Sequence, residues 1–507
     1  MPEKNSQRLL KNTIYLYARQ ILIMLITLFS VRVVLQVLGA EDYGINNVVA
    51  GAVTMFSFLN GAMATASQRF FSFELGKKNI ENLISIFHST LTIYCILILI
   101  IIILSETIGL WFVSTQLTIP PHRLSAALWI YQLSILSFAI SMISAPYIAS
   151  IISHENMDVY AYIAIAEACM KLIIIFLLPI LPYDKLISYG VLIMLSTLLT
   201  TSIYYWYCHK HYYECKRIYL RWDKTQIKEI ASFSGWNFFG SIAWILKNQG
   251  IAFLLNIYFG PIINAAQSIA NQIRTQSSTF YQNFSTALRP QIIKKYAERN
   301  LEGLFQMVHK GSKMTFFLML IIVSSLLFNL EYLLNIWLGK VPPYTIIFTQ
   351  LLLIETLIDS ISTPMATANQ ATGKIKIYQT FIGLVGLLNL PFSFIALKLG
   401  FSPIYVFIIG ITLQIIITGI RAFFLSKIQE GEFTSTLRYV ILPCFTVTLS
   451  VLIVNYFIRF DIMNFFIFLA QVAVHFLITV VFIYVLGLNK EEKQYVYQLI
   501  KKRISNK

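Results

Sequence analysis

"NIENLISIFHS" occupies residues 79–89, and "NLEGLFQMVHK" occupies residues 300–310, at an offset of 221 positions. An Asn, a Glu, a Leu and a His stand at the same four places in both stretches. At the same offset, the "TAS" that begins at Thr65 matches the "TAL" that begins at Thr286. Chance similarity among Leu- and Ile-rich helices does not favour repeated hydrophilic residues at one offset. We therefore predict that the chain contains two copies of one structural unit.

The composition places the chain in a membrane. Of its 507 residues, 57% are hydrophobic and 12% are charged, and the mean hydropathy is +0.69. A soluble globular protein carries about 25% charged residues, so most of this surface does not face water. Apolar runs of about 20 residues recur along the chain, which is the length of a helix that crosses roughly 30 Å of hydrocarbon. We predict an all-α integral membrane protein that needs no cofactor.

About fourteen transmembrane helices are predicted. Their approximate ranges are 14–38, 43–66, 83–105, 126–152, 159–181, 186–207, 231–257, 262–288, 313–335, 345–369, 377–397, 404–426, 437–458 and 464–487. With the N-terminus inside, the inner segments hold 28 Lys and Arg residues and the outer connections hold 5. Because cytoplasmic loops are enriched in Lys and Arg, both termini are expected in the cytoplasm and the protein in the cell inner membrane. The longest outer loop, after Ser105, has about 20 residues.

This topology accounts for most of the net charge of +16. The charge also favours contact with anionic membrane lipids, and a nucleic-acid partner is not expected. The first apolar stretch is too long for the core of a cleavable signal peptide. The spacing of "CHKHYYEC" at 208–215 matches no zinc pattern, so a basic loop rich in aromatic residues is the better interpretation and no metal site is predicted.

The repeat and the predicted helices together define an architecture. Helices one to six match helices seven to twelve in order, and Pro146 in the fourth helix matches Pro364 in the tenth at the slightly shifted offset of 218. Since an even number of helices separates the copies, both have the same orientation. We expect two parallel six-helix bundles, at 1–210 and 211–430, around a central cleft, followed by two further helices and a cytoplasmic tail at 431–507. Transporters of this kind bind substrate between the halves and alternate access by rocking.

Charged residues inside predicted membrane helices need an explanation, because each costs about 2.5–3.5 kcal/mol at mid-bilayer on insertion scales. Arg19 and Arg421 lie near cytoplasmic helix ends, where they can extend to the interface. Glu167 and Lys171 are four residues apart and can neutralise each other. His475, in the fourteenth helix, is expected to be a hydrogen-bonded packing residue.

Lys247 and Arg274 are different because both are predicted near the membrane midplane. Each lies about 20 Å from the turn between the seventh and eighth helices, at about 1.5 Å per residue. Polar stripes with helical spacing lie beside them: Asn237, Ser241, Trp244 and Asn248 in the seventh helix, and Gln267, Asn271 and Ser278 in the eighth. This pattern indicates a wet cavity with an anion site. The alternative is a set of internal ion pairs with Glu355 and Asp359 in the tenth helix.

Glu355 and Asp359 also suggest a function of their own. They are one helical turn apart at a similar depth, so they are candidates for ion coupling or conformational switching. The repeat gives Lys247 and Arg274 no charged counterparts, since Ile26 and Val53 stand at the equivalent positions. An asymmetric substrate fits this difference better than a symmetric pore does.

The stretches "RQILIMLITLFSVRVVLQVLGAEDYGINNVVAG" at 19–51 and "ATASQRFFSFELGKKN" at 64–79 resemble the polysaccharide (O-antigen, Wzx-type) flippases. This family belongs to the multidrug/oligosaccharidyl-lipid/polysaccharide transporter superfamily, with the MATE drug exporters and the lipid II flippases. The resemblance covers nearly the whole chain and is most specific in the first hundred residues, where "LG..DYG" follows the first helix.

The resemblance implies a flippase that carries undecaprenyl-pyrophosphate-linked oligosaccharide to the outer leaflet through a cationic central cavity. Lys247, Arg274 and Arg32 are our candidates for the cations of that cavity, although no residue-level motif transfers a site directly. Polysaccharide polymerase or chain-length machinery would be partners in such a pathway. Arg and Lys suit the pyrophosphate because both neutralise phosphate.

Three other functions stay open. A MATE-type cation-coupled drug exporter would favour carboxylates such as Glu355 and Asp359 over cations in the cleft. A membrane-bound polymerase or glycosyltransferase usually needs a sizeable outer loop, which is not predicted here. No GxxxxGK[ST] phosphate-binding motif is present, so ATP hydrolysis is not expected. The sequence does not distinguish these transporters from a scaffold of a synthase complex.

Overall fold

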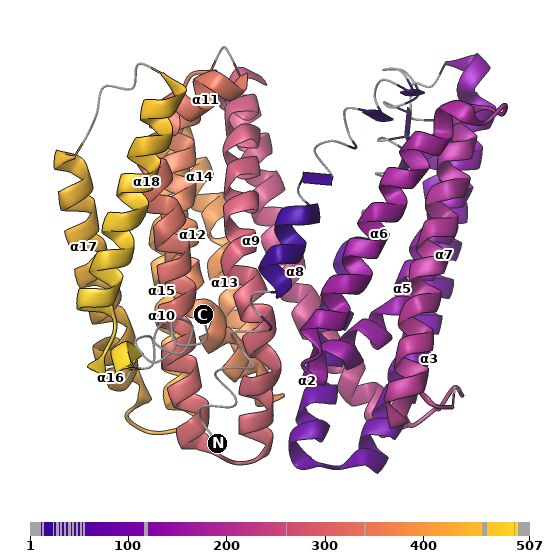
Figure 1. The fold of residues 1–507 in the computed structure, drawn as a ribbon, viewed down its shortest axis with the longest axis horizontal. Coiled ribbons are helices and arrows are strands. Elements are labelled where there is room, and N and C mark those ends of the chain that lie inside the picture. The colour runs from indigo at the N-terminus through magenta and orange to yellow at the C-terminus, as the bar shows by residue number, and fades with distance from the viewer. Residues whose placement is uncertain are drawn as a thin grey trace, which may run out of the picture. The chain divides into compact units, whose positions relative to one another are not determined.

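The computed structural model consists of helices joined by short connections (Figure 1). The residues that it describes are 12, 15–23, 25–26, 30, 33–34, 37–38, 42, 45–46, 49–50, 53, 56–115, 120–217, 219–259, 261–338, 341–458, 464–490 and 492–494. They divide into two compact units. Unit 1 comprises 1–241 and 293–299, and unit 2 comprises 242–292 and 300–507.

The described part of unit 1 includes six complete α-helices and parts of two longer ones, besides the helical residues described between 12 and 53. The complete helices are α2 (Ser57–Lys77), α3 (Ile80–Leu104), α4 (Leu110–Thr115), α5 (Leu124–Ser153), α6 (Met157–Leu177) and α7 (Lys185–His211). A π-helical turn, Ser105–Gly109, joins α3 to α4 without a break. The predicted outer loop after Ser105 is therefore largely helical as far as Thr115. The prediction missed this because it followed hydropathy, and the polar "SET" at 105–107 lowers hydropathy without ending the helix.

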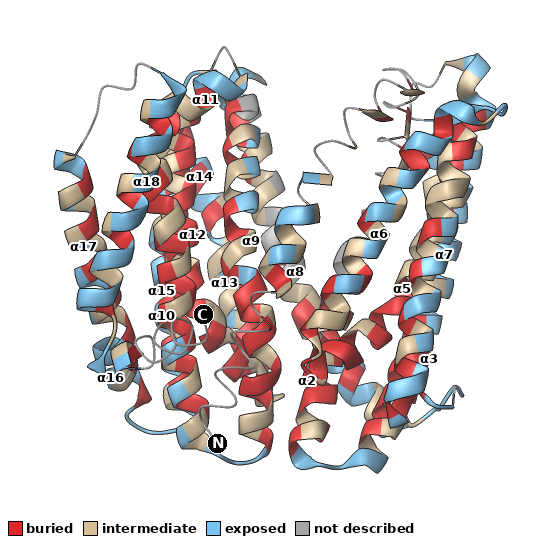
Figure 2. Cartoon of the chain, viewed as in Figure 1, coloured by how far each residue is buried: buried red, intermediate tan, exposed pale blue. Residues whose placement is uncertain are grey.

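Two long helices, α8 (Lys224–Phe259) and α9 (Pro261–Ala297), have residues in both units. The other helices of unit 2 are α10 (Leu301–Leu327), α11 (Leu330–Leu338), α12 (Thr345–Ala371), α13 (Lys376–Leu387), α14 (Asn389–Lys398), α15 (Ile404–Ser426), α16 (Glu432–Thr436), α17 (Leu442–Phe457) and α18 (Phe465–Phe482). Within each unit, buried residues line the sides on which helices pack together (Figure 2).

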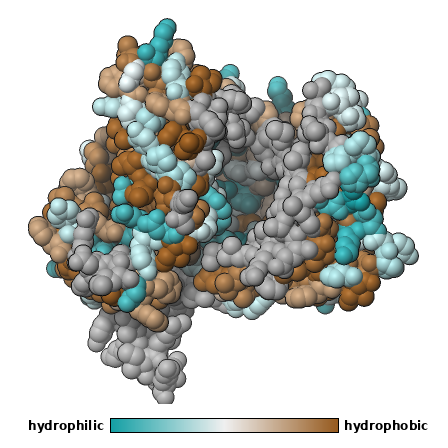
Figure 3. Space-filling model, turned by 90° about the horizontal axis from the view of Figure 1, so that it is seen from above, coloured by the Kyte–Doolittle hydropathy of each residue, from teal (hydrophilic) through white to brown (hydrophobic). Residues whose placement is uncertain are grey.

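Ten helical segments in the described residues are long and apolar enough to cross a membrane. Hydrophobic residues also make up much of the visible surface (Figure 3), as expected where lipid replaces water. The chain is thus a multi-pass membrane protein. The count of fourteen remains a prediction, because parts of 14–38 and of 43–66 lie outside the described residues. The ninth predicted helix was placed too late in the chain: α10 begins at Leu301 and ends at Leu327, since its first turns are polar.

The repeated phrase adopts the same local structure twice. Lys78 and Arg299, which precede it, both have left-handed backbone angles, with φ of 56° and 57°. The side chain of Asn79 caps α3 by accepting from the Asn82 N–H, and the side chain of Asn300 caps α10 in the same way. An Asn side chain satisfies an N–H group that the first helical turn leaves without a partner. The phrase is therefore a helix start that each copy needs.

The histidine of the phrase makes a longer-range contact in each copy. His88 on α3 bonds the main-chain oxygen of Arg217, beyond the end of α7. Its counterpart His309 on α10 lies 3.2 Å from the Glu432 carboxylate, beyond the end of α15. In each unit the histidine of the repeat thus joins the third helix of that copy to the segment after the sixth helix of that copy. Proline also lies inside both α5 and α12, at Pro146 and Pro364.

Candidate functional site

The first ion pair of the candidate site joins α8 to α12 within unit 2. Lys247 Nζ lies 2.6 Å from Glu355 Oε1, and the two side chains are only 12% and 10% exposed. Both residues were predicted at mid-depth from counting along single helices. Two charges in a medium of low polarity attract strongly, but each has also lost the water that solvated it. A buried pair of this kind is therefore costly to break by removing one partner.

The second oxygen of Glu355 faces a small polar recess. An ideal Cβ built on Gly410 of α15 would lie 3.3 Å from Glu355 Oε2 and 3.2 Å from Asn389 Nδ2. Asn389 is fully buried, and its Oδ1 accepts a hydrogen bond from Ser393 Oγ at 2.9 Å. Its Nδ2 has no hydrogen-bond partner among the residues that the structure describes. The absence of a side chain at position 410 thus leaves space between an amide donor and a carboxylate.

Asn389 is a site residue that the sequence analysis missed. It is the first residue of α14, directly after the break from α13 at Leu388. Pro391 explains why a new helix starts there, because its nitrogen cannot donate to the main-chain oxygen four residues earlier. A proline is tolerated in the first turn, where that N–H is not needed. The sequence signal was the "NLP" at 389–391 inside an otherwise apolar predicted helix.

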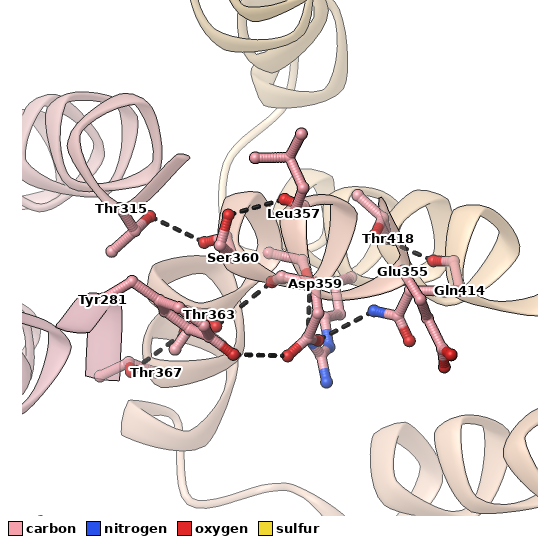
Figure 4. A network of polar contacts seen from close by, with 12 residues as sticks. Tyr281, Thr315, Glu355, Leu357, Asp359, Ser360, Thr363, Thr367, Gln414 and Thr418 are labelled. Carbon is pink, nitrogen blue, oxygen red and sulfur yellow. Dashed lines mark hydrogen bonds and ion pairs between the residues drawn. The ribbon is translucent and has the colours of Figure 1, made fainter. Parts of the chain in front are cut away.

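Asp359, one turn after Glu355 on α12, is surrounded by three donors from two other helices (Figure 4). Its Oδ1 accepts from Gln414 Nε2 at 2.8 Å and from Arg421 Nη1 at 3.0 Å, both on α15. Its Oδ2 accepts from the Tyr281 hydroxyl of α9 at 3.1 Å. These charge-assisted bonds satisfy the carboxylate from both sides. Asp359 thus ties α12 to α9 and α15.

Arg421 does not extend to the cytoplasmic interface, as we expected from its position near a helix end. Its guanidinium turns inward to Asp359 and also donates to Ser362 Oγ. Depth alone suggested an interfacial side chain, but a carboxylate on the neighbouring helix offers a stronger partner. The predicted partners of Asp359 were Lys247 and Arg274, but in the structure Asp359 pairs with Arg421 instead.

Arg274 lies on α9 with an amide neighbour. Its Nη2 approaches Asn248 Oδ1 of α8 at 3.5 Å, which is a long and weak hydrogen bond. This contact brings the two predicted polar stripes together within unit 2. Gln267 is buried and Asn271 half-buried on α9. The five charged residues of this region, Lys247, Arg274, Glu355, Asp359 and Arg421, comprise three cations and two carboxylates.

The remaining predicted site residues are placed differently. Asn237 belongs to unit 1, where its amide donates to the main-chain oxygen of Phe233 at 3.1 Å. Arg32 and the side chain of Ser241 lie outside the described residues.

Two other predictions about buried charges are confirmed. Lys171 Nζ bonds Glu167 Oε1 at 2.6 Å. His475 is fully buried, and its ring nitrogens bond Asn329 Nδ2 and the main-chain oxygen of Ile458.

Comparisons with known proteins agree with this helical architecture. A family model described as polysaccharide biosynthesis protein matches residues 9–296. A search of curated proteins finds no match.

Among solved structures, the chain resembles a multidrug resistance MATE family transporter of the MOP superfamily in an outward-facing conformation. The identity is 13% and the TM-score 0.72, over 86% of this chain and 96% of that one. It also resembles a MOP superfamily transporter from Pyrococcus furiosus, at 11% identity and a TM-score of 0.67, over 84% of this chain and 96% of that one. A MATE structure in complex with MaD3S is similar as well, at 14% identity and a TM-score of 0.69, over 86% of this chain and 97% of that one. At these identities the likeness concerns the fold.

Proposed function

The chain belongs to the polysaccharide biosynthesis protein family, and we propose that it is a flippase for undecaprenyl-pyrophosphate-linked oligosaccharide. It moves the repeat unit of an O-antigen, capsule or exopolysaccharide from the cytoplasmic to the outer leaflet of the inner membrane by alternating access. The family match and the MATE-like fold support a transporter of this superfamily. The physical need is clear, because a sugar head group with a pyrophosphate cannot cross hydrocarbon unaided.

The Lys247–Glu355 pair is the observation that carries the proposal. A lysine at this depth needs an anionic partner in every state of the transport cycle, since an unpaired buried charge is costly. In the described structure, Glu355 fills that role. When substrate enters, a phosphate oxygen takes the place of the carboxylate on Lys247, and Arg274 approaches the same pyrophosphate from α9. The carboxylate therefore holds the cation ready while the site is empty.

The neutral residues have a supporting role in this proposal. Asn248, Gln267 and Asn271 donate hydrogen bonds to sugar hydroxyls and accept them, together with Asn237 and Ser241. Arg32 is the third candidate cation for the pyrophosphate. Glu355 and Asp359 couple the cycle to an ion gradient, because Glu355 loses Lys247 when the site fills and Asp359 lies one turn away on the same helix. Membrane lipids and polysaccharide polymerase or chain-length machinery are the expected partners.

A MATE-type cation exporter is the second candidate. The Pyrococcus furiosus neighbour is described as having a binding pocket of reverse polarity that suggests a different function, so one fold can accommodate pockets of either sign. In this chain, however, Lys247 and Arg421 already neutralise Glu355 and Asp359. A cationic drug would have to displace a buried lysine or arginine. The fold likeness offers less support for a polymerase or glycosyltransferase.

The test is export of surface polysaccharide in a flippase-deleted host that carries each variant at equal membrane abundance. Lys247→Ala and Arg274→Ala should each reduce export strongly, and Arg274→Ala should have a larger effect than Asn271→Ala because charged hydrogen bonds are about twice as strong as neutral ones. Arg274→Lys should restore part of the export, since Lys lacks the planar fork.

Lys171→Ala is a matched control, because Lys171 is also paired on a membrane helix but lies in unit 1. It should leave export near the wild-type level. Full export by the Lys247→Ala, Arg274→Ala double variant would reject the anion site.

A further inference from the structure

The connection between α7 and α8, which we call the 212–223 linker, has a buried beginning. Its sequence is "YYECKRIYLRWD". Tyr212, Glu214 and Cys215 are buried. Glu214 Oε1 accepts hydrogen bonds from Ser150 and His154, at 3.2 and 2.9 Å. The start of the linker is thereby fixed to α5 and to the turn that follows it.

The rest of the linker is fixed to α3 through main-chain atoms. The ring of His88 bonds the main-chain oxygen of Arg217 and stacks on the ring of Tyr219, with centroids 3.8 Å apart. Thr92 Oγ1 donates to the main-chain oxygen of Arg221 and accepts from its N–H, both at 3.1 Å. Side-chain substitutions at 216, 217 and 221 therefore leave these main-chain contacts in place.

The side chains of this part of the linker are exposed. Trp222 is 65% exposed and Leu220 is 64% exposed, and the cations Lys216, Arg217 and Arg221 are exposed as well. The acids of the linker are already engaged. Glu214 is buried with its two donors, and the carboxylate of Asp223 caps α8 by accepting from two main-chain N–H groups. The exposed surface is thus cationic and aromatic.

The level of this surface along α3 indicates what it meets. The helical segment from Ile80 to Thr115 has 36 residues and is about 54 Å long at 1.5 Å per residue, which exceeds a hydrocarbon core of roughly 30 Å. The linker lies against its polar first turns, where Ser85 and Ser89 bond Gln226 and Thr92 bonds the linker. That end has the Lys and Arg excess expected of the cytoplasmic side.

We propose that the 212–223 linker is a binding surface for anionic phospholipid head groups of the cytoplasmic leaflet. Lys216, Arg217 and Arg221 contact the lipid phosphates, while Leu220 and Trp222 enter the interface beside them. Aromatic side chains favour this depth, and basic residues near an anionic leaflet gain attraction within a Debye length. The surface would anchor unit 1 in the membrane independently of what the protein transports.

The experiment measures thermal unfolding of the full chain in nanodiscs of phosphatidylcholine alone and with about one third phosphatidylglycerol. The test variant carries Lys216→Gln, Arg217→Gln and Arg221→Gln. The matched control carries Lys310→Gln, Lys374→Gln and Lys490→Gln, which removes three exposed cations from unit 2. A third variant, Leu220→Ser with Trp222→Ser, keeps the linker's cations and removes its exposed apolar side chains.

Phosphatidylglycerol should raise the unfolding temperature of the wild type and the control, and high salt should reduce this rise. In the test variant, most of this rise in unfolding temperature should be lost. In the Leu220→Ser, Trp222→Ser variant, part of it should be lost. An undiminished rise in the test variant would overturn the proposal, as would an equal loss in the control.

Soluble pyrophosphate added to phosphatidylcholine nanodiscs should give no comparable rise in unfolding temperature. An equal rise would assign the surface to free phosphates instead. If the test variant does not accumulate, the single variants Arg217→Gln and Arg221→Gln are each compared with the wild type. A reduced rise in unfolding temperature supports the proposal, and an undiminished rise in both overturns it.

Discussion

Lys247 on α8 and Glu355 on α12 are 108 residues apart in sequence, and their charged atoms lie 2.6 Å from each other. Glu355 Oε2 remains beside Asn389 Nδ2, across the space that Gly410 leaves open. Glu355 therefore has a second polar neighbour when Lys247 turns to another anion. A single pair of residues can then serve both the stability of unit 2 and the binding of substrate, and mutations can separate the two roles.

Lys247→Ala should destabilise the protein by about 3–5 kcal/mol, because it leaves a buried carboxylate without its cation. Adding Glu355→Gln should recover most of that stability, since neither charge then remains unpaired. Export should stay low in the double variant if Lys247 binds phosphate. Thermal unfolding in detergent and surface polysaccharide are measured in parallel. Recovery of both stability and export in the double variant would show that Lys247 only balances the charge of Glu355.

Replacement of either carboxylate tests ion coupling. Export or uptake into vesicles is measured against an imposed proton or sodium gradient, with Glu355→Gln and Asp359→Asn each compared with the wild type. We expect at least one variant to lose its response to the gradient, because the carboxylate that exchanges partners has lost its charge. Tyr281→Phe removes one neutral donor to Asp359 and should retain the response. Full gradient dependence in both carboxylate variants would contradict the assignment.

Gly410→Ala tests the recess beside Glu355. The new Cβ would lie 3.2–3.3 Å from Asn389 and Glu355, so both side chains must shift. We expect a loss of about 1–3 kcal/mol of stability, as for other overpacked cores, together with reduced export. Gly419→Ala on the same helix is the control, because a Cβ there meets nothing within 4 Å. It should be neutral or stabilising by up to about 1 kcal/mol. Equal behaviour of the two variants would argue against a tight recess.

The acid sensitivity of unit 1 should depend partly on Asp184. The Arg123 guanidinium bonds both Asp184 and Asp42 at 2.6 Å. Hydrogen bonding to Arg123, followed by main-chain N–H groups of α7, lowers the pKa of Asp184 below its ordinary value of about 3.9. A depressed folded-state pKa adds stability above the unfolded pKa, and that stability is lost as pH falls through the folded value.

Unfolding temperatures are therefore compared between about pH 6 and pH 3 for the wild type and Asp184→Asn. The wild type should be more stable at the upper end, and its advantage should shrink toward pH 3. The effect should be small, since Asp184 is one-third exposed. Asp223→Asn, at another helix N-terminus, controls for the loss of a cap. An advantage that does not change with pH would contradict the explanation.

The predicted orientation has a direct test. Residues 190 and 210 lie on α7 at a separation of about 30 Å along the helix axis, which is the thickness of the hydrocarbon core. Reporter fusions after Gly190 and after Lys210 should report the outside and the cytoplasm, respectively. A cytoplasmic signal from the Gly190 fusion would reject both the topology and the alignment of the repeat.

Local sequence patterns predicted much of the fold because helix formation in a membrane is decided locally. Each predicted helix from the third onward overlaps a helix of the structure, but the ninth is shifted along the chain and the eleventh is divided at Leu388 into α13 and α14. Asn79 and Asn300 act as caps because a cap needs only the next three residues. The pairing of Glu167 with Lys171 likewise follows from their spacing of one helical turn.

Tertiary structure decided which charges meet. Counting along a helix gives the depth of a residue and shows which residues of that helix lie on the same face. It does not show toward which neighbouring helix that face is turned. Depth therefore suggested Lys247 and Arg274 as partners for Asp359, but packing brought Arg421 of α15 to it. It also brought Asn389 to Glu355, although a helix break within an apolar stretch shows no partner in sequence. The sequence by itself determined the helices, their caps and the family; the packing of α8, α9, α12, α14 and α15 determined the site, because a pair across helices depends on how every helix of the unit is rotated and placed.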